Sequence, residues 1–489
     1  MKYRWITLLL VILTVLPFAA ACKKRDPLQE NPGTETVTEP ETDGWSDSLP
    51  KELDFGDKTV RILWRGLSGQ FSDSRTGDVV DDAMYTRDAE VEKRLGIRIQ
   101  NVGKDYTYDS RDQYVSYITG SVMSGGEDSY DIVSGHYILM PALVSGGYLT
   151  DLSATPYLSP EKPWYASGLA EETTIDGKLY LVTGDISGTY ISDIYCMYVN
   201  MALIRALNLE DPYTLVREKK WTLETFESMV KGAYHDRGGD GQKTRDDRFG
   251  LCVPSANHLS AWMPAAGIKL TEMNSNHYPV ISCDSEKTVD LVTRVEKLVY
   301  DNEDTIFYNN DKGANYTTLA KDFLGGQYLF AQEKFASAKD LCAGRTDVLL
   351  LPMPMYNADQ KGYYTSMGEQ TNLFAIPKGV ENGGCSAATI EALSAYSHAY
   401  VSTAYYEKQL KLQYSASSEM SQMFDLIRSG VQISFGSVYG YGFNYLSAWF
   451  KDCVSNRREW KTYLDEKQEP AERQLRKFFD DIIANANKY

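Results

Sequence analysis

KTVRILWRGLSGQFSDSRTGDVVDDAMYTRDAEVEKRLGIRIQ, residues 58–100, contains the pattern that decides the fold class. The first seven residues alternate in character and are rich in β-branched side chains, which predicts a strand over 58–64. Apolar side chains then recur at helical spacing from 79 to 95, and Gly96 is a stop signal for a helix. Residues 97–100 alternate again. A strand, a helix and a second strand in this order predict parallel pairing in an α/β sheet.

The same alternation continues in the residues that follow. Residues 111–123 have helical spacing, 130–134 read as a third strand, and 139–144 as a further helix. We therefore expect an open α/β sheet that is covered on both faces by helices. Ligands bind such sheets beyond the carboxyl ends of the strands. The ends predicted in this way are Trp64-Arg65-Gly66, with Asp81 or Asp82 nearby, and Gly135-His136-Tyr137.

Farther along, residues 177–190 and 195–200 predict two strands around a turn at Gly184-Asp185, and residues 347–351 predict a late strand. The helices predicted after this point cover residues 222–234, 288–300 and 387–412, and the tail from Trp449 is also expected to be helical.

The composition excludes several classes of protein. Of the 489 residues 43% are hydrophobic, enough for a large buried core and too many for a wholly disordered chain. Mean hydropathy is −0.38, which rules out a polytopic membrane protein. A formal net charge of −17 argues against a nucleic-acid partner, because phosphate binding needs clustered positive charge. The 5 histidines are scattered along the chain, so a histidine-based zinc site is not expected.

Residues 1–22, MKYRWITLLLVILTVLPFAAAC, have the composition of an export signal. Basic residues precede an apolar stretch that is too short to span a membrane, and small alanines follow it. This order resembles a bacterial lipoprotein signal, in which Cys22 would become the lipidated first residue of the mature chain. Ala19 stands where that family usually has Leu. The alternative is plain secretion, with Cys22 in the discarded peptide.

Residues 23–56 are rich in Thr, Glu, Pro and Asp and nearly free of apolar side chains, so we expect a flexible tether. A signal ending at Cys22, a tether and a globular part predict a protein anchored by lipid to the extracellular face of the bacterial cell membrane. The other six cysteines are widely spaced and form no CxxC pair, and we expect them to be free buried thiols.

Several short motifs occur in a set order between residues 57 and 460. They are Tyr130-Asp-Ile-Val133, Gly146-Gly-Tyr-Leu-Thr-Asp-Leu152, Lys162-Pro-Trp164, Gly177-Lys-Leu-Tyr180 with Gly184-Asp185, Lys220-Trp-Thr222, Asp236 to Gly250, Leu351-Pro-Met-Pro354 with Gln360 to Tyr364, and Ala404-Tyr-Tyr406 with Ser418-Glu-Met420. On these motifs the chain resembles the extracellular solute-binding proteins of ABC importers, family 1, the oligosaccharide-binding class related to maltose-binding protein.

The resemblance implies an α/β fold of two lobes, of the type II periplasmic-binding-protein kind, that close on a ligand by a hinge motion. It places one crossover between the lobes near residues 181–187 and the other near 366–372. The implied boundaries are 57–183 plus 368–410 for lobe 1, and 186–365 plus 411–489 for lobe 2.

The resemblance also implies that the chain is not an enzyme, needs no cofactor, and passes a bound carbohydrate to the transmembrane subunits of an ABC permease. Sugars stack their apolar faces on aromatic rings and hydrogen-bond to carboxylates, amides and arginine. An acidic, Tyr-rich and His-poor exported protein suits a neutral oligosaccharide. Trp262 is the predicted stacking platform, and for every candidate the alternative is a place in the core or on a lobe surface. The candidate ligand contacts are Trp64, Arg65, Asp81, His136, Asp185, Tyr190, Asn257, Trp262 and Glu369.

Residues 236–250, DRGGDGQKTRDDRFG, resemble an EF-hand-type calcium loop. Such a loop takes oxygen ligands at positions 1, 3, 5, 7, 9 and 12 and needs Gly at position 6. Gly238 stands at position 3, where Asp or Asn is required, and position 12 is Asp rather than Glu. A structural calcium ion is therefore weighed against a metal-free turn. The candidate ligands are Asp236, Asp240, the backbone carbonyl of Gln242, Thr244 and Asp247.

Motifs of competing enzyme classes are absent from the sequence. The chain has no G-x-x-x-x-G-K-[ST] motif, so it is not the ATPase of an importer, and no G-x-S-x-G or H-E-x-x-H motif. An extracellular glycan-active enzyme stays an alternative, because the two carboxyl groups of a glycosidase can come from distant parts of a chain. A third possibility keeps the binding fold with a peptide or another solute as ligand.

Overall fold

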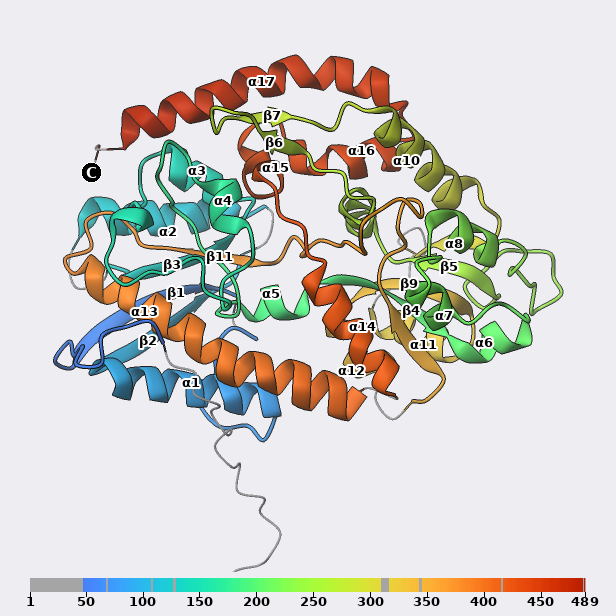
Figure 1. Cartoon of the computed structure of the whole chain (residues 1–489), viewed down its shortest axis with the longest axis horizontal. Helices are drawn as coiled ribbons and strands as arrows, with labels where there is room; N and C mark the ends of the chain where they lie inside the picture. The colour runs from blue at the N-terminus through green and yellow to red at the C-terminus, as the bar shows by residue number, and fades with distance from the viewer. Residues whose placement is uncertain are drawn as a thin grey trace, which may run out of the picture. The chain divides into compact units, whose positions relative to one another are not determined.

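The computed structural model describes residues 47–66, 69–106, 109–125, 129–308, 316–342, 345–414, 417–486 and 488. The predicted signal, Cys22 and residues 23–46 of the predicted tether lie outside these residues. From Asp47 onward the described chain belongs to one compact unit, in which Figure 1 shows two α/β bodies and a long helix running across both.

The predicted strand–helix–strand unit forms as β1 (Lys58–Arg65), α1 (Val79–Leu95) and β2 (Ile97–Lys104). β1 and β2 pair in parallel. The Asp78 carboxylate accepts hydrogen bonds from two backbone N–H groups of the first turn of α1. Gly96 ends the helix in the left-handed conformation, with φ 59°, and a side chain there would collide with Asp54. The helix therefore begins and ends at its capping residues.

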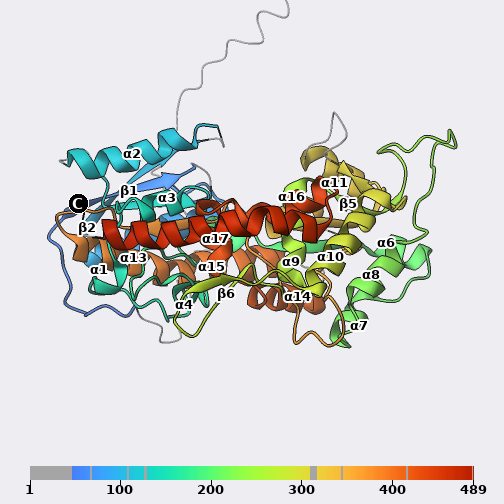
Figure 2. The ribbon, with the colours of Figure 1, turned by 90° about the horizontal axis from the view of Figure 1, so that it is seen from above.

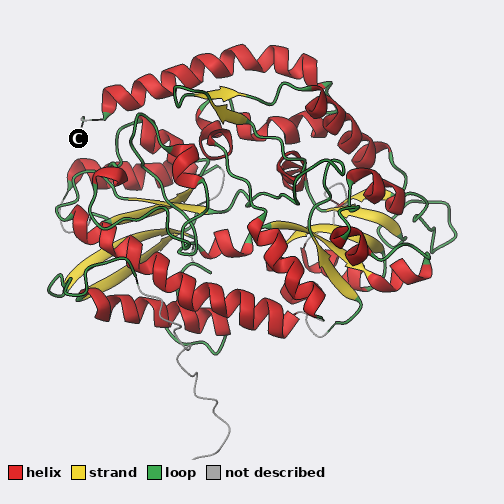
Figure 3. Ribbon diagram, in the orientation of Figure 1, coloured by secondary structure: helices red, strands yellow, loops and turns green. Residues whose placement is uncertain are grey.

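Lobe 1 is built on a four-stranded sheet in the order β11–β3–β1–β2. Its further strands are β3 (Ile132–His136) and β11 (Asn372–Ala375). Figure 3 shows helices above and below this sheet. They are α1 together with α2 (Arg111–Ser124), α3 (Met140–Ser145), α4 (Leu169–Thr173), α13 (Gly383–Tyr396) and the π-helix η6 (Ser397–Tyr414).

Lobe 2 is built on a five-stranded sheet in the order β10–β4–β9–β5–β8. Its strands are β4 (Tyr195–Asn200), β5 (Phe249–Val253), β8 (Thr305–Phe307), β9 (Tyr328–Lys334) and β10 (Val348–Leu351). Its helices are α6 (Met201–Ala206), α7 (Pro212–Arg217), α8 (Leu223–Val230), α9 (Trp262–Ala265), α10 (Glu286–Glu296) continued by the π-helix η3 (Lys297–Asp301), α11 (Tyr316–Leu324), α12 (Ala338–Leu341), α14 (Ser418–Ser429) and α16 (Trp449–Ser455).

Two strands run against the parallel pairing expected from the sequence. β11 is antiparallel to β3, and β4 is antiparallel to both β9 and β10. Each of them is the first strand after a connection between the lobes. Because the chain then enters the sheet at the edge where the neighbouring strands end, it has to run in the opposite direction.

The strand predicted over residues 177–190 does not form. This segment makes only single bridges, such as Val182 with Phe374, and ends in α5 (Gly188–Ser192), whose N-cap is Ser187. The segment passes from one lobe to the other, so it has no partner strand along most of its length. The second strand of the predicted pair forms as β4.

A third layer, which we call the roof, lies above both sheets in Figure 1. The roof consists of residues 267–283 with β6 (Thr271–Met273) and β7 (Pro279–Ile281), residues 431–448 with α15 (Phe435–Tyr439), and α17 (Trp460–Asn485). α17 contacts α10 of lobe 2 and α3 of lobe 1. The second half of α17, which the predicted boundaries place in lobe 2, therefore also contacts lobe 1. The predicted boundaries stay predictions.

The predicted tether, residues 23–56, includes residues at its C-terminal end that are folded onto lobe 1. The Asp47 carboxylate binds the Arg94 guanidinium at 3.0 Å, and the Ser48 hydroxyl donates to the Glu391 carboxylate at 2.6 Å. Leu49 is buried. Residues 47–49 therefore belong to the folded unit, because two specific polar contacts and one apolar side chain hold them on lobe 1.

All six cysteines of the described chain are buried and unpaired, as the wide spacings led us to expect. A helix with the length and apolar character needed to cross a membrane does not occur in the part of the chain that the structure describes.

Candidate ligand-binding site

Two crossover segments lie side by side between the lobes. Ile194 forms an antiparallel bridge with Met367, and the N–H of Gly368 donates to the carbonyl of Asp193 at 2.6 Å. The Thr365 hydroxyl donates to the carbonyl oxygen at the start of β4 at 2.8 Å. Because these bonds tie one crossover to the other, the two segments form a single paired hinge.

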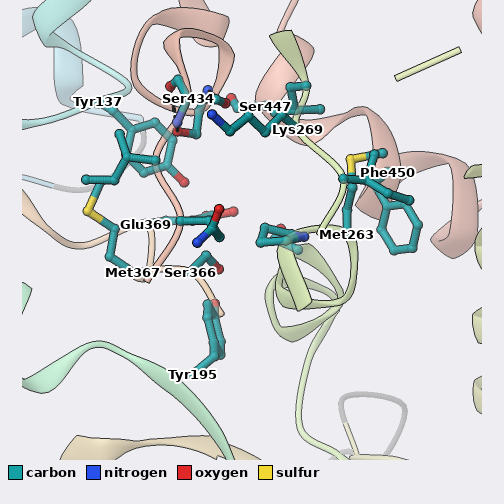
Figure 4. A pocket seen from close by; sticks show the side chains of 17 residues that line it. Tyr137, Tyr195, Met263, Lys269, Ser366, Met367, Glu369, Ser434, Ser447 and Phe450 are labelled. Carbon is teal, nitrogen blue, oxygen red and sulfur yellow. Dashed lines mark hydrogen bonds between the residues drawn. The ribbon is translucent and has the colours of Figure 1, made fainter. Parts of the chain in front are cut away.

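A cavity of about 80 Å³ lies at this hinge, between the lobes and below the roof. Figure 4 shows Glu369 near its centre, with Tyr137 and Met367 on one side and Met263 and Phe450 on the other. Tyr137 follows the carboxyl end of β3, whereas Met263 and Phe450 belong to α9 and α16. Both lobes and the second crossover therefore contribute to one cavity.

Two lysine–carboxylate pairs lie at the hinge. The Lys451 ammonium is 3.0 Å from a carboxylate oxygen of Glu369 and 3.1 Å from the amide oxygen of Asn257. The Lys334 ammonium is 2.6 Å from the Asp193 carboxylate. Burial raises the pKa of Asp193, and the charge of Lys334 opposes that rise. Because each carboxylate has an ammonium partner, the groups provide donors and acceptors with little net charge.

The lobe 1 side of the hinge carries Arg65, Tyr106 and His136. The Arg65 guanidinium lies over the Tyr106 ring and donates to the side chain of Gln370 in the second crossover. The His136 ring lies 5.1 Å from the Tyr106 ring, centroid to centroid. His136 Nδ1 is among the buried side-chain atoms of the described chain that have no hydrogen-bond partner. This wall therefore offers the Nδ1 atom of His136 for a further hydrogen bond.

Comparison with known proteins gives matches of structure only. No family model and no curated sequence matches the chain. The GacH receptor of Streptomyces glaucescens, described unliganded and with acarbose, is 15% identical, with a TM-score of 0.53 over 88% of this chain and 99% of that chain. The MalE domain of Bdellovibrio bacteriovorus bound to maltotriose is 16% identical, with a TM-score of 0.54 over 86% of this chain and 100% of that chain. The lacto-N-biose-binding protein of the Bifidobacterium longum ABC transporter is 12% identical, with a TM-score of 0.55 over 87% of this chain and 98% of that chain.

The chain has the fold of the ABC-transporter solute-binding proteins. These neighbours bind sugars, and their similarity covers most of the chain. The two-lobed α/β fold expected from the sequence is thereby confirmed.

Four of the predicted contact residues lie together at the hinge of this solute-binding fold. Arg65 reaches Gln370, whose neighbour Glu369 is linked through Lys451 to Asn257. The Tyr106 ring contacts both the His136 ring and the Arg65 guanidinium. These residues come from strand ends and a crossover, as the sequence predicted, and their contact with a ligand stays a prediction.

The two predicted tryptophans are core residues. Trp64 is 0% exposed, packs edge-on against Phe374, and donates its indole N–H to Asn101 at 2.6 Å. Trp262 is 1% exposed and donates to Gln332 at 3.1 Å. The burial of Trp262 favours the alternative of a core residue, and its role as a stacking platform stays a prediction. Tyr137, Tyr195 and Phe450 supply the aromatic rings of the cavity instead.

Asp185 fastens the hinge instead of facing the cavity. Its carboxylate is 2% exposed and binds the Arg428 guanidinium of α14 at 3.1 and 3.2 Å. The other neighbour is the His398 ring of η6, at 2.5 Å. Asp185 thus joins the first crossover to helices of both lobes, and Tyr190 is half-buried nearby on α5.

Asp81 lies apart from the other candidates. It lines a second cavity, of about 310 Å³, beside α5, together with Lys339 of α12 and Tyr405 of η6. The Thr76 hydroxyl donates to its carboxylate at 3.0 Å.

Sequence reasoning missed Lys451 and Gln370. Lys451 belongs to a charged helical tail, where lysine is usually a surface residue, and only the fold brings it to Glu369. Gln370 was within reach, because it directly follows a predicted contact in the second crossover. Tyr137 belonged to a predicted strand end but was not singled out.

The loop at 236–247 holds its own carboxylates. Asp236 accepts backbone hydrogen bonds from Gly239 and Gly241 at 2.6 and 2.7 Å, which lower its pKa. Asp247 is buried and accepts from Arg237 and Thr244 at 3.0 and 2.8 Å. Within the described ranges, no group of three or more His, Cys, Asp or Glu side chains is arranged to hold a metal ion. In this arrangement Asp236 and Asp247 are engaged by backbone donors of the loop.

Calcium at this loop stays a prediction that thermal unfolding can test. A filled site would stabilise the folded chain, so millimolar calcium should raise the melting temperature. Asp236→Asn should remove that rise, and Asp246→Asn, whose position is no candidate ligand, should keep it. If calcium leaves the melting temperature unchanged, the prediction of a calcium site at this loop is wrong.

We expect His136 to make the free energy of unfolding depend on pH. Burial lowers its pKa to about 3, and the charge of Arg65 acts in the same direction. Because an unfolded histidine has a pKa of about 6.5, the unfolded chain binds a proton between about pH 6.5 and pH 3 that the folded chain does not. The free energy of unfolding should therefore fall by about 1.4 kcal/mol for each pH unit in that window.

His136→Gln should remove this part of the slope in urea unfolding between pH 4 and 7. The exposed His277→Gln is the control and should keep it. Equal slopes for the parent and His136→Gln would contradict the assignment.

Proposed function

We propose that this protein is the lipid-anchored, extracellular substrate-binding component of an ABC importer. It captures a carbohydrate of the oligosaccharide class between its lobes and delivers this ligand to the permease. The observation that carries the proposal is the hinge cavity, which combines the rings of Tyr137, Tyr195 and Phe450 with the Glu369–Lys451 pair. A cavity lined by aromatic side chains and by polar groups that compensate each other suits a neutral sugar. The structural neighbours support this, since they include binders of acarbose, maltotriose and lacto-N-biose.

The charge pairing supports binding without turnover. A glycosidase needs two carboxyl groups on either side of the scissile bond, one of which gives a proton to the leaving group. Glu369 and Asp193 each bind a lysine ammonium, so both carboxylates are already engaged in ion pairs. Delivery to a permease, rather than hydrolysis, is therefore the proposed outcome of capture.

A thermal-unfolding screen of residues 26–489 against an oligosaccharide panel tests the proposal. A glycan at 100 times its Kd should add about 2.7 kcal/mol of stability, a rise of several degrees. Mass spectrometry should show the glycan intact. A rise only with peptides or other solutes would keep the fold and overturn the carbohydrate, and breakdown of the glycan would favour the enzyme.

The proposed anchor predicts a specific effect of one substitution. Cys22→Ser removes the only thiol that could carry the lipid, so the protein should move from the membrane fraction to the soluble fraction and lose label from radioactive palmitate. Cys385→Ser, a buried thiol, is the matched control and should stay with the membrane. Retention of label in Cys22→Ser would contradict the anchor.

A further inference from the structure

The C-terminal helix α17 connects the two lobes at a place away from the hinge. It has 26 residues and therefore spans about 39 Å. Figures 1 and 2 both show it running from α10 of lobe 2 to α3 of lobe 1. The crossovers are thus not the only link between the lobes.

The beginning of α17 is held firmly on lobe 2. The indole N–H of Trp460 donates to the carbonyl of Cys283 at 3.2 Å, and the ring is 1% exposed. The Lys461 ammonium binds the Asp284 carboxylate at 2.9 Å. Both partners directly precede α10. A large buried side chain and an ion pair therefore fasten this end.

The end of α17 is held on lobe 1 by hydrogen bonds and a close backbone approach. The Asn485 amide donates to the carbonyl of Ser145, the last residue of α3, at 2.9 Å. The Lys378 ammonium, from the segment after β11, donates to the carbonyl of Ala486. The helix end comes so close to Gly147 that a side chain there would lie 2.5 Å from the carbonyl oxygen of Asn485. The contact with lobe 1 thus includes two hydrogen bonds and requires that residue 147 has no side chain, while Phe478 and Phe479 of the same half pack on Phe435 of the roof.

We propose that α17 is a latch between the lobes, whose C-terminal end must leave α3 before the lobes can separate at the hinge. A helix cannot lengthen without breaking its own hydrogen bonds, so one of its two attachments has to yield. We expect the attachment on lobe 1 to yield, because two hydrogen bonds hold the helix end there, whereas Trp460 buries its indole ring on lobe 2. The latch favours the arrangement in which the cavity is covered, and it does not depend on which solute binds.

Other contacts between the roof and lobe 1 accompany the latch. The Lys269 ammonium binds the Glu172 carboxylate of α4 at 2.5 Å, and the Tyr439 hydroxyl donates to the carbonyl of Thr173 at 3.4 Å. Releasing α17 is therefore expected to add a separated population rather than to open every molecule.

Pulsed EPR distances across the hinge test the latch. Spin labels are placed at Lys93→Cys on α1 and Glu224→Cys on α8, which are exposed positions of lobe 1 and lobe 2. Cys22→Ser in the same chain removes one native thiol, and the other six are buried. Two latch variants are compared without any solute: Gly147→Ala, and the pair Lys378→Ala with Asn485→Ala.

The controls separate the latch from general damage. Gly177→Ala matches Gly147→Ala in backbone strain, with φ 73° against 75°, but has no neighbouring atom within 4 Å. Lys477→Ala changes an exposed ion pair of α17 that touches neither lobe. Both latch variants should show a longer-distance population at least several-fold larger than in the parent, and both controls should match the parent. Distance distributions of both latch variants that equal the parent's, at an unchanged melting temperature, would overturn the proposal.

Discussion

Lys451→Met is expected to lower the free energy of unfolding by about 3–5 kcal/mol, because it leaves the Glu369 carboxylate buried without its partner. Both side chains of this pair are 13% exposed, so water screens the charge poorly. The same change removes the donor to Asn257 and should abolish measurable glycan binding. Urea unfolding and calorimetric titration measure the two effects.

Two further variants sharpen this test. Adding Glu369→Gln to Lys451→Met should recover part of the stability, since no unpaired charge remains, but it should not restore binding. Lys477→Met, which breaks an exposed ion pair on α17, should change neither quantity appreciably. A Lys451→Met protein as stable as its parent and with normal affinity would show that the pair is not part of the site.

Trp262→Ala is expected to cost about 3–5 kcal/mol of stability, the usual loss for a large aromatic side chain removed from a packed core. Trp262 packs against Phe226 and donates to Gln332. Trp262→Phe keeps most of the volume and should lose less. Where the Ala variant is still folded, its affinity for the glycan should stay within a few-fold of the parent's. Unchanged stability with lost affinity would support the stacking role that the sequence suggested.

The sequence predicted the first sheet and its helix well because local signals agree there. The β-branched alternation at residues 58–64, the helical spacing after Asp78 and the stop at Gly96 each act within a few residues. The reversed strands β4 and β11 were missed because their direction depends on where the chain re-enters a sheet. Local pattern does not contain that information.

The candidate site was predicted in part for the same reason. Strand ends and crossovers pointed to Arg65, His136 and Glu369, which the fold brings to the hinge. A tryptophan after a strand fits a core as well as a ligand platform, and only burial separates the two cases for Trp64 and Trp262. The amphipathic pattern of α17 shows that one face is buried. It does not show that the helix packs against both lobes.

The most direct test of carbohydrate capture at the hinge cavity is a calorimetric titration of the parent, Phe450→Leu and Tyr117→Leu with the glycan that the screen selects. Phe450 lines the hinge cavity, whereas Tyr117 is an exposed ring on α2. We predict saturable one-to-one binding with an intact glycan. We also predict at least a tenfold loss of affinity in Phe450→Leu, which is about 1.4 kcal/mol, and no change in Tyr117→Leu. Equal affinity in all three proteins, or no binding by the parent to any glycan, would contradict carbohydrate capture at this cavity.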